Sequence, residues 1–275
     1  MQTVKAHGAE IPALGFGVFR MSDAEVERVV PAALEAGFTH FDTAQIYGNE
    51  AALGRALQTA GARREDLFLT TKVWVDNYSP EKFAASVDES LDKLKVDKAD
   101  LLLLHWPADK VAIADQIEML NAVQAAGKTR FIGVSNQNVA QLRESISSSK
   151  APIVTNQIEL HPYLDQSAMA EAARTAGVAI TAYYGMADGA VPRDPVLQQI
   201  GSTYGKSAAQ VGLRWLIQQG FVALSKTAKP ERVAENFAVF DFALSDEEMV
   251  AIGKLARPDG RLVSPPGLAP AWDAI

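Results

Sequence analysis

The feature of this sequence that most restricts its fold is a regular alternation of short apolar runs and helix-like segments. Leu101-Leu102-Leu103-Leu104 contains no polar residue, whereas Val26, Val29 and Val30 recur at helical spacing. Continuous apolar runs are typical of strands in a parallel sheet that is buried on both faces. About eight strand–helix pairs follow one another, and this number closes into a barrel. We therefore predict a (β/α)8 TIM barrel of the α/β class.

The same alternation predicts the bounds of the elements. Strands are expected at 14–18, 39–42, 67–73, 101–105, 131–135, 153–157, 178–183 and 221–224. Helices are expected at 23–36, 49–60, 79–94, 113–126, 142–146, 166–176 and 208–219, with a longer insertion at 184–205. A short N-terminal β-hairpin (4–14) should precede the barrel, and two extra helices (230–237 and 246–255) and an irregular tail (257–275) should follow it.

Two helix starts carry specific signals. Ser22 and Glu25 resemble a capping box, and Gly37 is placed to end that helix. Ser79 followed by Pro80 reads as an N-cap with proline at the first helical position. Because no linker or low-complexity segment divides the chain, we expect residues 1–275 to form one domain.

Composition excludes several classes of protein. The 275 residues include no cysteine, which excludes a disulfide framework, thiolate metal sites and a cysteine nucleophile. A net charge of −7 argues against nonspecific nucleic-acid binding. Neither a signal peptide nor an apolar stretch long enough to cross a membrane is found, and no histidine pair suggests a metal. We expect a cytoplasmic, monomeric protein without a metal.

Polar or aromatic residues follow all the expected strands. In a (β/α)8 barrel the carboxyl ends of the strands carry the active site. The residues concerned are Gly17 to Arg20, Asp42 and Tyr47, Lys72 and Trp74, His105 and Trp106, Ser135 and Asn136, Asn156 and Gln157, Tyr183 and Tyr184, and Ser225 to Thr227. Their common placement indicates a pocket on one rim.

Four of these residues, Asp42, Tyr47, Lys72 and His105, can form an acid–base site. Lys72 comes from the strand next to Asp42, and a buried carboxylate needs a compensating charge. A phenol has an ordinary pKa of about 10, and we expect the Lys72 ammonium to lower that of Tyr47. With a histidine opposite, the group could protonate a developing alkoxide. The alternative is an ion pair that merely holds the rim together.

A basic segment follows the eighth strand. Lys226, Thr227, Lys229 and Arg232 stand at the expected start of a helix, where cations, a hydroxyl and free N–H groups suit a phosphate monoester. The alternative is a solvated basic turn. In a protein of net charge −7, however, a local basic cluster at this corner of a barrel favours an anion site.

A planar carboxamide could bind to three other strand-end residues. Ser135, Asn136 and Gln157 supply hydrogen-bonding groups, and Tyr183 supplies a ring that could stack on the ligand. Each is weak evidence alone, because amide residues at strand ends often cap helices. Gly15-Phe16-Gly17 lacks the third glycine and the acidic residue of a dinucleotide fingerprint.

At this point the sequence resembles the aldo-keto reductase family, in particular its short bacterial branch that includes 2,5-diketo-D-gluconate reductases. The resemblance covers nearly the whole chain. Its motifs are Gly37-Phe38 through Asp42-Thr43-Ala44, Tyr47-Gly48-Asn49-Glu50, Thr71-Lys72, Leu103-Leu104-His105-Trp106-Pro107, Gly133-Val134-Ser135-Asn136, Asn156 through Pro162, and Pro230-Glu231-Arg232 with Glu235-Asn236.

The resemblance implies NADPH-dependent reduction of an aldehyde or ketone, with NADH as a further possibility. It implies that Tyr47 is the general acid and that Asp42, Lys72 and His105 complete a tetrad. The implied cofactor residues are Ser135, Asn136 and Gln157 for the nicotinamide carboxamide, Tyr183 for its ring, Lys226, Thr227 and Arg232 for the adenosine 2′-phosphate, and Glu235 and Asn236 for the adenine. Phe19, Trp74 and Trp106 would line the pocket of a small-molecule carbonyl substrate, closed by the tail with Trp272.

The sequence departs from the family pattern at two places. Tyr184-Gly185-Met186 stands where Ser-Pro-Leu or Gly-Pro-Leu is common, and Ser225-Lys226-Thr227 stands where Pro-Lys-Ser is usual. Two other functions remain open at this point. Lys72 or Lys226 could form a Schiff base in an aldolase or lyase, and the same scaffold could serve as a non-catalytic nicotinamide-binding regulatory subunit.

Overall fold

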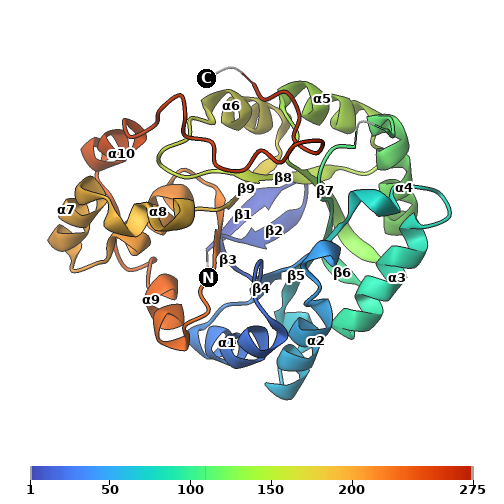
Figure 1. Ribbon diagram of the computed structural model, residues 1–275, viewed down its shortest axis with the longest axis horizontal. Helices are drawn as coiled ribbons and strands as arrows, with labels where there is room; N and C mark the ends of the chain where they lie inside the picture. The colour runs from blue at the N-terminus through green and yellow to red at the C-terminus, as the bar shows by residue number, and fades with distance from the viewer. Residues whose placement is uncertain (1, 109, 274–275) are drawn as a thin grey trace.

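Parallel strands closed into a barrel form the centre of the molecule. The computed structural model describes residues 2–108 and 110–273. Within these residues, eight parallel strands close a barrel in the order β10-β3-β4-β5-β6-β7-β8-β9, and helices surround it (Figure 1). The predicted (β/α)8 fold is confirmed. The barrel strands are β3 (Leu14–Gly17), β4 (His40–Asp42), β5 (Phe68–Val73), β6 (Ala99–Leu104), β7 (Thr129–Ser135), β8 (Ile153–Glu159), β9 (Ala179–Tyr183) and β10 (Val222–Ser225).

Helices follow the strands as the alternation predicts. They are α1 (Asp23–Ala36), α2 (Glu50–Thr59), α3 (Phe83–Leu94), α4 (Ile113–Ala125), α5 (Val139–Ser148), α6 (Ser167–Ala176), α7 (Pro195–Tyr204), α8 (Ala208–Gln218), α9 (Val233–Phe237) and α10 (Asp246–Gly253). Short 3-10 turns are η1 (Gln45–Tyr47), η2 (Arg64–Asp66), η3 (Val75–Asn77), η4 (Ala187–Gly189), η5 (Val191–Arg193) and η6 (Pro230–Arg232).

The predicted signals at both ends of α1 are present. Ser22 and Glu25 form a capping box, in which each side chain bonds the backbone N–H of the other residue. Gly37 ends the helix at φ 107°, a left-handed conformation that favours glycine, and its N–H reaches the carbonyls of Ala33 and Leu34.

Two predicted helix bounds are wrong. Helix α3 begins at Phe83, because Ser79 and Pro80 lie in a turn in which the Ser79 carbonyl accepts the N–H groups of Lys82 and Phe83. The helix expected at 230–237 is divided into the 3-10 turn η6 and the short helix α9. The insertion at 184–205 contains a regular element, α7, which the strand–helix alternation did not predict.

The N-terminal hairpin closes one end of the barrel interior. Its antiparallel strands are β1 (Thr3–Ala6) and β2 (Ala9–Pro12), as predicted. Ala6, Ala9 and Ile11 pack against apolar side chains from inside the barrel, among them Phe68 and Leu103. Because this end is filled, a ligand site has to lie at the opposite end, where the strands have their carboxyl ends.

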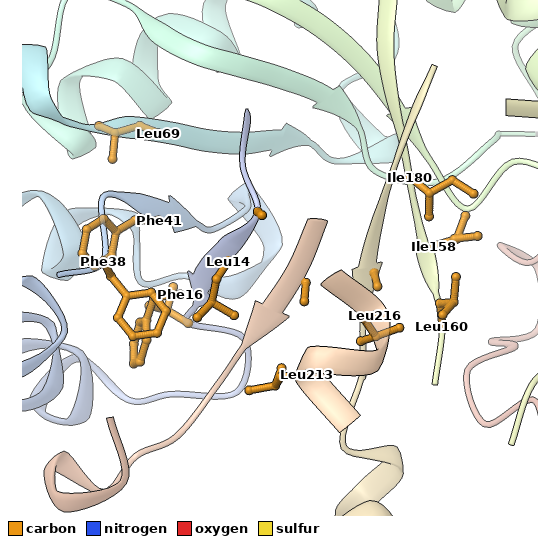
Figure 2. Close-up of a cluster of buried hydrophobic side chains, with 14 of the residues drawn as sticks. Leu14, Phe16, Phe38, Phe41, Leu69, Ile158, Leu160, Ile180, Leu213 and Leu216 are labelled. Carbon is orange, nitrogen blue, oxygen red and sulfur yellow. The ribbon is translucent and has the colours of Figure 1, made fainter. Parts of the chain in front are cut away.

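A larger apolar core fills the layer between strands and helices. Figure 2 shows Phe16, Phe38 and Phe41 gathered on one side of it, while Leu213 and Leu216 project from α8. The ring of Phe16 lies 5.4 Å from that of Phe38 and 6.2 Å from that of Phe41. These contacts join β3 and β4 to the segment after α1, and they hold the strand that carries Asp42.

The tail after α10 is irregular over its described residues, as expected for 257–275; residues 274–275 lie outside the described part. In Figure 1 it crosses the barrel face near β8 and β9 and continues toward α5. Among residues 2–108 and 110–273, no helix combines the length and the apolar character needed to span a membrane.

One buried histidine links neighbouring strands. The ring of His40 is buried, and its Nε2 lies 3.0 Å from the Thr70 hydroxyl of β5. Gly15 of β3 leaves room for the ring, because a Cβ there would lie 2.6 Å from His40 Nδ1. Burial lowers the pKa of His40 to about 4, against an opposing effect of the Asp42 charge. The imidazole is therefore neutral at neutral pH.

His40 should make the protein less stable in acid. Its pKa is lower in the folded protein than in the unfolded chain, so the unfolded chain binds more protons between about pH 6.5 and pH 4. Folding stability should therefore be lost as the pH falls through this window, by about 2–3 kcal/mol at pH 4.5. Denaturant unfolding of His40→Gln should show a correspondingly weaker dependence on pH. His7→Asn changes an exposed histidine and should keep the wild-type dependence; equal behaviour of the two variants would contradict the assignment.

Candidate active site

A buried ion pair lies at the carboxyl end of neighbouring strands. Lys72 of β5 places its Nζ 2.6 Å from Oδ1 of Asp42, the last residue of β4, and both side chains are buried. The same Nζ donates to the Thr43 carbonyl at 2.8 Å and to the Tyr47 hydroxyl at 3.3 Å. The three hydrogens of the ammonium thus have three acceptors, which offsets its desolvation. The expected ion pair of Asp42 and Lys72 is present, and Lys72 also contacts the Tyr47 hydroxyl.

Tyr47 ends the 3-10 turn η1, which Gly48 closes in a left-handed conformation. Its ring centroid lies 4.9 Å from that of Phe19 and 5.5 Å from that of His105. Asn49 holds this loop against the neighbouring one, because its side-chain amide donates to the carbonyls of Val18 and Met21.

The direction expected for the pKa of Tyr47 is wrong. Burial raises it well above the ordinary value, and the Asp42 charge raises it further. The ammonium of Lys72 does not reverse this, because it is itself buried and shared with the Asp42 carboxylate. The phenol of the free protein is therefore protonated at neutral pH and keeps a proton that it could donate.

His105 directly follows β6 and faces Tyr47. Burial lowers its pKa well below the ordinary value, and the charge of Lys72 acts in the same direction. The imidazole is thus neutral, with one N–H donor and one acceptor nitrogen. The Trp74 ring stands edge-on at 5.3 Å from the His105 ring.

Gln45 is a residue of the site that sequence reasoning missed. Its Oε1 accepts from the Trp74 N–H at 2.8 Å and from Asn77 Nδ2 at 2.9 Å, while its Nε2 donates to the Ser86 carbonyl and the Ser90 hydroxyl. These bonds tie η1, and hence Tyr47, to η3 and α3. Only its place in the segment between Asp42 and Glu50 could have drawn attention to it.

Glu50, a motif residue without an assigned role, lies buried below the same loop. It accepts the Thr71 hydroxyl at 2.6 Å and the Ser90 hydroxyl at 3.3 Å. Burial raises its pKa, against the effect of these hydrogen bonds. Glu50 thus joins the strand residue beside Lys72 to the helix that holds Gln45.

The three residues expected to bind a carboxamide lie together at the ends of β7 and β8. Ser135 Oγ donates to the Gln157 carbonyl at 2.7 Å, and Asn136 Nδ2 donates to Ser135 Oγ at 3.1 Å and to the His105 carbonyl at 3.0 Å. Gln157 Nε2 donates to Oδ2 of Asp42 at 2.8 Å. The residues expected to bind the carboxamide are therefore in direct contact with the tetrad through the bond from Gln157 to Asp42.

Tyr183, expected to stack on a ring, also belongs to this cluster. Its hydroxyl donates to Asn136 Oδ1 at 2.6 Å. Asn136 adopts φ 60°, a left-handed conformation that asparagine tolerates better than most residues. Burial raises the pKa of Tyr183 far above the ordinary value, so its phenol is neutral.

The residues expected to bind the adenosine end all follow β10 in the chain. Lys226, Arg232 and Glu235 are exposed, whereas Thr227 and Asn236 are buried. Thr227 Oγ1 accepts the N–H of Lys229 and so shapes the loop. Lys226 and Arg232 have no carboxylate within ion-pair distance among the described residues. Two exposed cations thus follow β10 in an acidic protein, where they could attract an anion.

Aromatic residues stand around the tetrad. Phe19 is 42% exposed although it contacts Tyr47, and Trp106 is buried. The Trp272 ring of the tail lies 6.5 Å from the Trp106 ring. These contacts are compatible with the pocket walls expected at Phe19, Trp74 and Trp106. In the described part of the chain, no cluster of three or more histidine, aspartate or glutamate residues is arranged to hold a metal.

Glu159 attaches the tail to the barrel, a role that sequence reasoning missed. This fully buried carboxylate, at the end of β8, accepts the N–H groups of Leu262 at 2.7 Å and Val263 at 2.9 Å. His161 lies 2.9 Å from the same carboxylate and braces it. A carboxylate that receives several donors is a strong, fixed anchor.

Contacts at three further positions hold the tail against the barrel and α5. At Gly260 the chain passes so close to the Tyr163 carbonyl that a Cβ would lie 1.8 Å from its oxygen. At the far end, the Asp273 carboxylate accepts the N–H of Val139 at the start of α5, and Asn138 Nδ2 donates to the Ala271 carbonyl. The tail is thus attached on both sides of Trp272.

The sequence is similar to those of known proteins over nearly its whole length. A model of the Aldo/keto reductase family matches residues 13–257. The methylglyoxal reductase DkgB of Salmonella typhimurium LT2 is 41% identical over 266 residues, which are 96% of this chain and 99% of that protein. An aldo-keto reductase of Mycolicibacterium smegmatis is 39% identical over 260 residues, or 92% of this chain and 94% of that protein.

Solved structures give the same result. The crystal structure of a candidate 2,5-diketo-D-gluconic acid reductase B matches with a TM-score of 0.98 and 60% identity, over 100% of this chain and 98% of that one. An aldo-keto reductase of Bombyx mori in complex with NADP matches with a TM-score of 0.86 and 32% identity, over 93% of this chain and 92% of that one.

The anchoring role of Glu159 predicts a local effect of its replacement. In Glu159→Gln the buried charge that receives the Leu262 and Val263 amides is lost, so these amides should exchange with solvent roughly 5- to 100-fold faster, which corresponds to about 1–3 kcal/mol. Hydrogen exchange followed by mass spectrometry on tail peptides measures this. Glu171→Gln, an exposed glutamate on α6, should leave tail exchange unchanged. Unaltered exchange in Glu159→Gln would refute the anchor.

Proposed function

Because this chain belongs to the aldo/keto reductase family, we propose that it reduces an aldehyde or ketone with NADPH and that Tyr47 protonates the carbonyl oxygen. That it is an oxidoreductase acting on carbonyl groups follows from the family and from the similar methylglyoxal reductase. The observation that carries the finer proposal is the buried contact of Lys72 with both Asp42 and Tyr47.

Tyr47 is the general acid. Its phenol is neutral in the free protein, so it holds the proton that a developing alkoxide requires. Donation leaves a phenolate 3.3 Å from the Lys72 ammonium, which stabilises the new negative charge. Asp42 keeps the Lys72 ammonium charged and oriented, so its positive charge stays in place to stabilise the Tyr47 phenolate in each turnover. The neutral imidazole of His105 offers an N–H that can orient the carbonyl oxygen toward Tyr47.

Ser135, Asn136 and Gln157 would hold the carboxamide of the cofactor, and Tyr183 would lie against its ring. The bound cofactor would supply the hydride for the carbonyl carbon. The bond from Gln157 to Asp42 means that the residues that hold the nicotinamide also fix the tetrad. Binding and proton donation are thereby kept in one geometry.

Lys226, Thr227 and Arg232 would bind the 2′-phosphate, with Glu235 and Asn236 beside the adenine. Lys226 and Arg232 are exposed and form no ion pair within the part of the chain that the structure describes, which supports NADPH over NADH, and a similar structure holds NADP. The names of similar proteins suggest two kinds of substrate, neutral methylglyoxal and an acidic diketo sugar acid.

The Schiff-base alternative at Lys72 is disfavoured by the same contacts. A nucleophilic amine needs a free lone pair. The buried Lys72 nitrogen instead donates hydrogen bonds to Asp42, Thr43 and Tyr47. The intact tetrad likewise disfavours a purely regulatory role.

Replacing Tyr47 with phenylalanine tests the mechanism. Loss of the proton donor should lower kcat by about 10²–10⁴-fold, whereas the Kd for NADPH should stay within about twofold. Steady-state oxidation of NADPH with a model aldehyde and fluorescence titration of NADPH measure the two quantities. Tyr204→Phe, which removes a hydroxyl bonded to Glu248 on distant helices, should retain wild-type turnover. Retained turnover in Tyr47→Phe would refute the role.

The cofactor assignment predicts a selective loss. Lys226→Met and Arg232→Met each remove a cation from the proposed 2′-phosphate site, so kcat/KM for NADPH should fall about 10- to 100-fold while that for NADH changes little. Lys254→Met removes an exposed cation elsewhere and controls for net charge. Equal losses with both cofactors would contradict binding of the 2′-phosphate.

A further inference from the structure

Arg261 of the tail occupies an unusual position at the mouth of the barrel. Its side chain is only 14% exposed, and its guanidinium carbon lies 3.7 Å from the centre of the Trp272 ring. Trp272 in turn contacts Trp106, which follows His105 in the chain. A mostly buried cation thus lies against the tail tryptophan that contacts Trp106, one of the residues proposed to line the substrate pocket.

The guanidinium is incompletely satisfied. Nη1 of Arg261 is buried and meets no hydrogen-bond acceptor among residues 2–108 and 110–273. Most buried polar atoms in proteins have a partner, and a charged donor without one is costly. Such a group is suited to receive an acceptor from a ligand.

The neighbouring carboxylates do not fill this role. Glu159 Oε2 lies 3.8 Å from Nη1, beyond hydrogen-bond distance, and the carboxylate already accepts the amides of Leu262 and Val263. Asp273 is engaged by the N–H of Val139. Both anions keep Arg261 charged in its buried position but leave hydrogen-bonding capacity on the guanidinium.

Arg261 also lies near the proposed cofactor residues. Burial lowers the pKa of Arg261, and the charges of Glu159 and Asp273 oppose this shift. Tyr183 is the residue whose hydroxyl bonds Asn136. Glu159, whose carboxylate lies 3.8 Å from Nη1 of Arg261, is the register partner of Tyr183 on the neighbouring strand. The Arg261 cation therefore stands near the group proposed to lie against the nicotinamide.

We propose that Arg261 binds a carboxylate of the substrate, so that the preferred substrates are oxo acids, which carry an aldehyde or ketone and a carboxylate in one molecule. This inference rests on the proposed function and names the substrate class of that site. A guanidinium matches the planar carboxylate with paired N–H donors. A monoanion fits better than a phosphate dianion, because Glu159 already offsets part of the single positive charge.

The contacts of the tail fix the position of Arg261, which would allow it to select substrates that carry a carboxylate. Glu159 fixes the amides directly after Arg261, and Gly260 directly before it fits only without a Cβ. The guanidinium is held against the Trp272 ring, so little side-chain entropy is lost when a carboxylate binds.

Paired substrates test the proposal. The wild-type protein and Arg261→Met are assayed with NADPH on 4-carboxybenzaldehyde and its methyl ester, and on succinic semialdehyde and its methyl ester. For at least one pair, kcat/KM of the acid should fall about 10- to 100-fold in Arg261→Met, mainly through KM, while that of the ester stays within about twofold. The proposal is overturned if Arg261→Met leaves the ratio of kcat/KM for acid over ester unchanged in both pairs. This includes an equal loss on acid and ester, which would indicate a purely structural role.

Two further variants keep the test decisive. Arg257→Met removes an arginine of the same tail that stacks on Tyr163 but is exposed and paired with Asp259, so it should leave both substrates unaffected. If Arg261→Met does not fold, as judged by thermal unfolding, Arg261→Lys keeps the charge without the planar fork and should still lose selectivity for the acid; full retention there overturns the proposal. Failure of the wild-type protein to oxidise NADPH with any of the four aldehydes would instead refute the proposed function.

Discussion

The buried ion pair of Lys72 and Asp42 is the interaction on which the rest of the site depends. Removing two charges from water is expensive, and a pair persists only when the remaining donors and acceptors are used. Here Lys72 also bonds Thr43 and Tyr47, while Gln157 donates to the second oxygen of Asp42. Because no donor of the ammonium is left over, the charge is fixed beside the Tyr47 hydroxyl.

The barrel makes this arrangement possible. Asp42 and Lys72 come from the adjacent strands β4 and β5, so their ion pair is a contact between neighbours. Gln157 comes from β8, which stands four strands from β4 around the closed barrel. The bond from Gln157 to Asp42 therefore crosses the barrel mouth and joins the tetrad to the proposed carboxamide residues. An open sheet would keep these strands apart.

Much of this could be predicted from the sequence, because the strands are continuous apolar runs and their last residues must share one rim. The features that were missed depend on three-dimensional detail. Ser79 and Pro80 satisfy a local helix-start pattern, but the turn that precedes α3 uses the Ser79 carbonyl instead. The pKa of Tyr47 depends on how completely the fold buries it, which outweighs the single ammonium visible in the sequence. The bonds of Gln45 follow from loop geometry, for which no sequence pattern exists.

Glu159 shows that a polar residue at the end of a barrel strand can have a structural role instead of a place in the candidate active site. It stands at the end of β8 as Asp42 stands at the end of β4, and both are buried carboxylates. Asp42 faces a cation and a phenol, whereas Glu159 faces backbone amides of the tail. One carboxylate thus stabilises the charge beside the proposed proton donor, and the other holds the tail segment that bears Arg261. Strand-end position alone predicts that a carboxylate lies at the rim, and its hydrogen-bond donors determine whether it fixes a cation beside a phenol or anchors the tail of the chain.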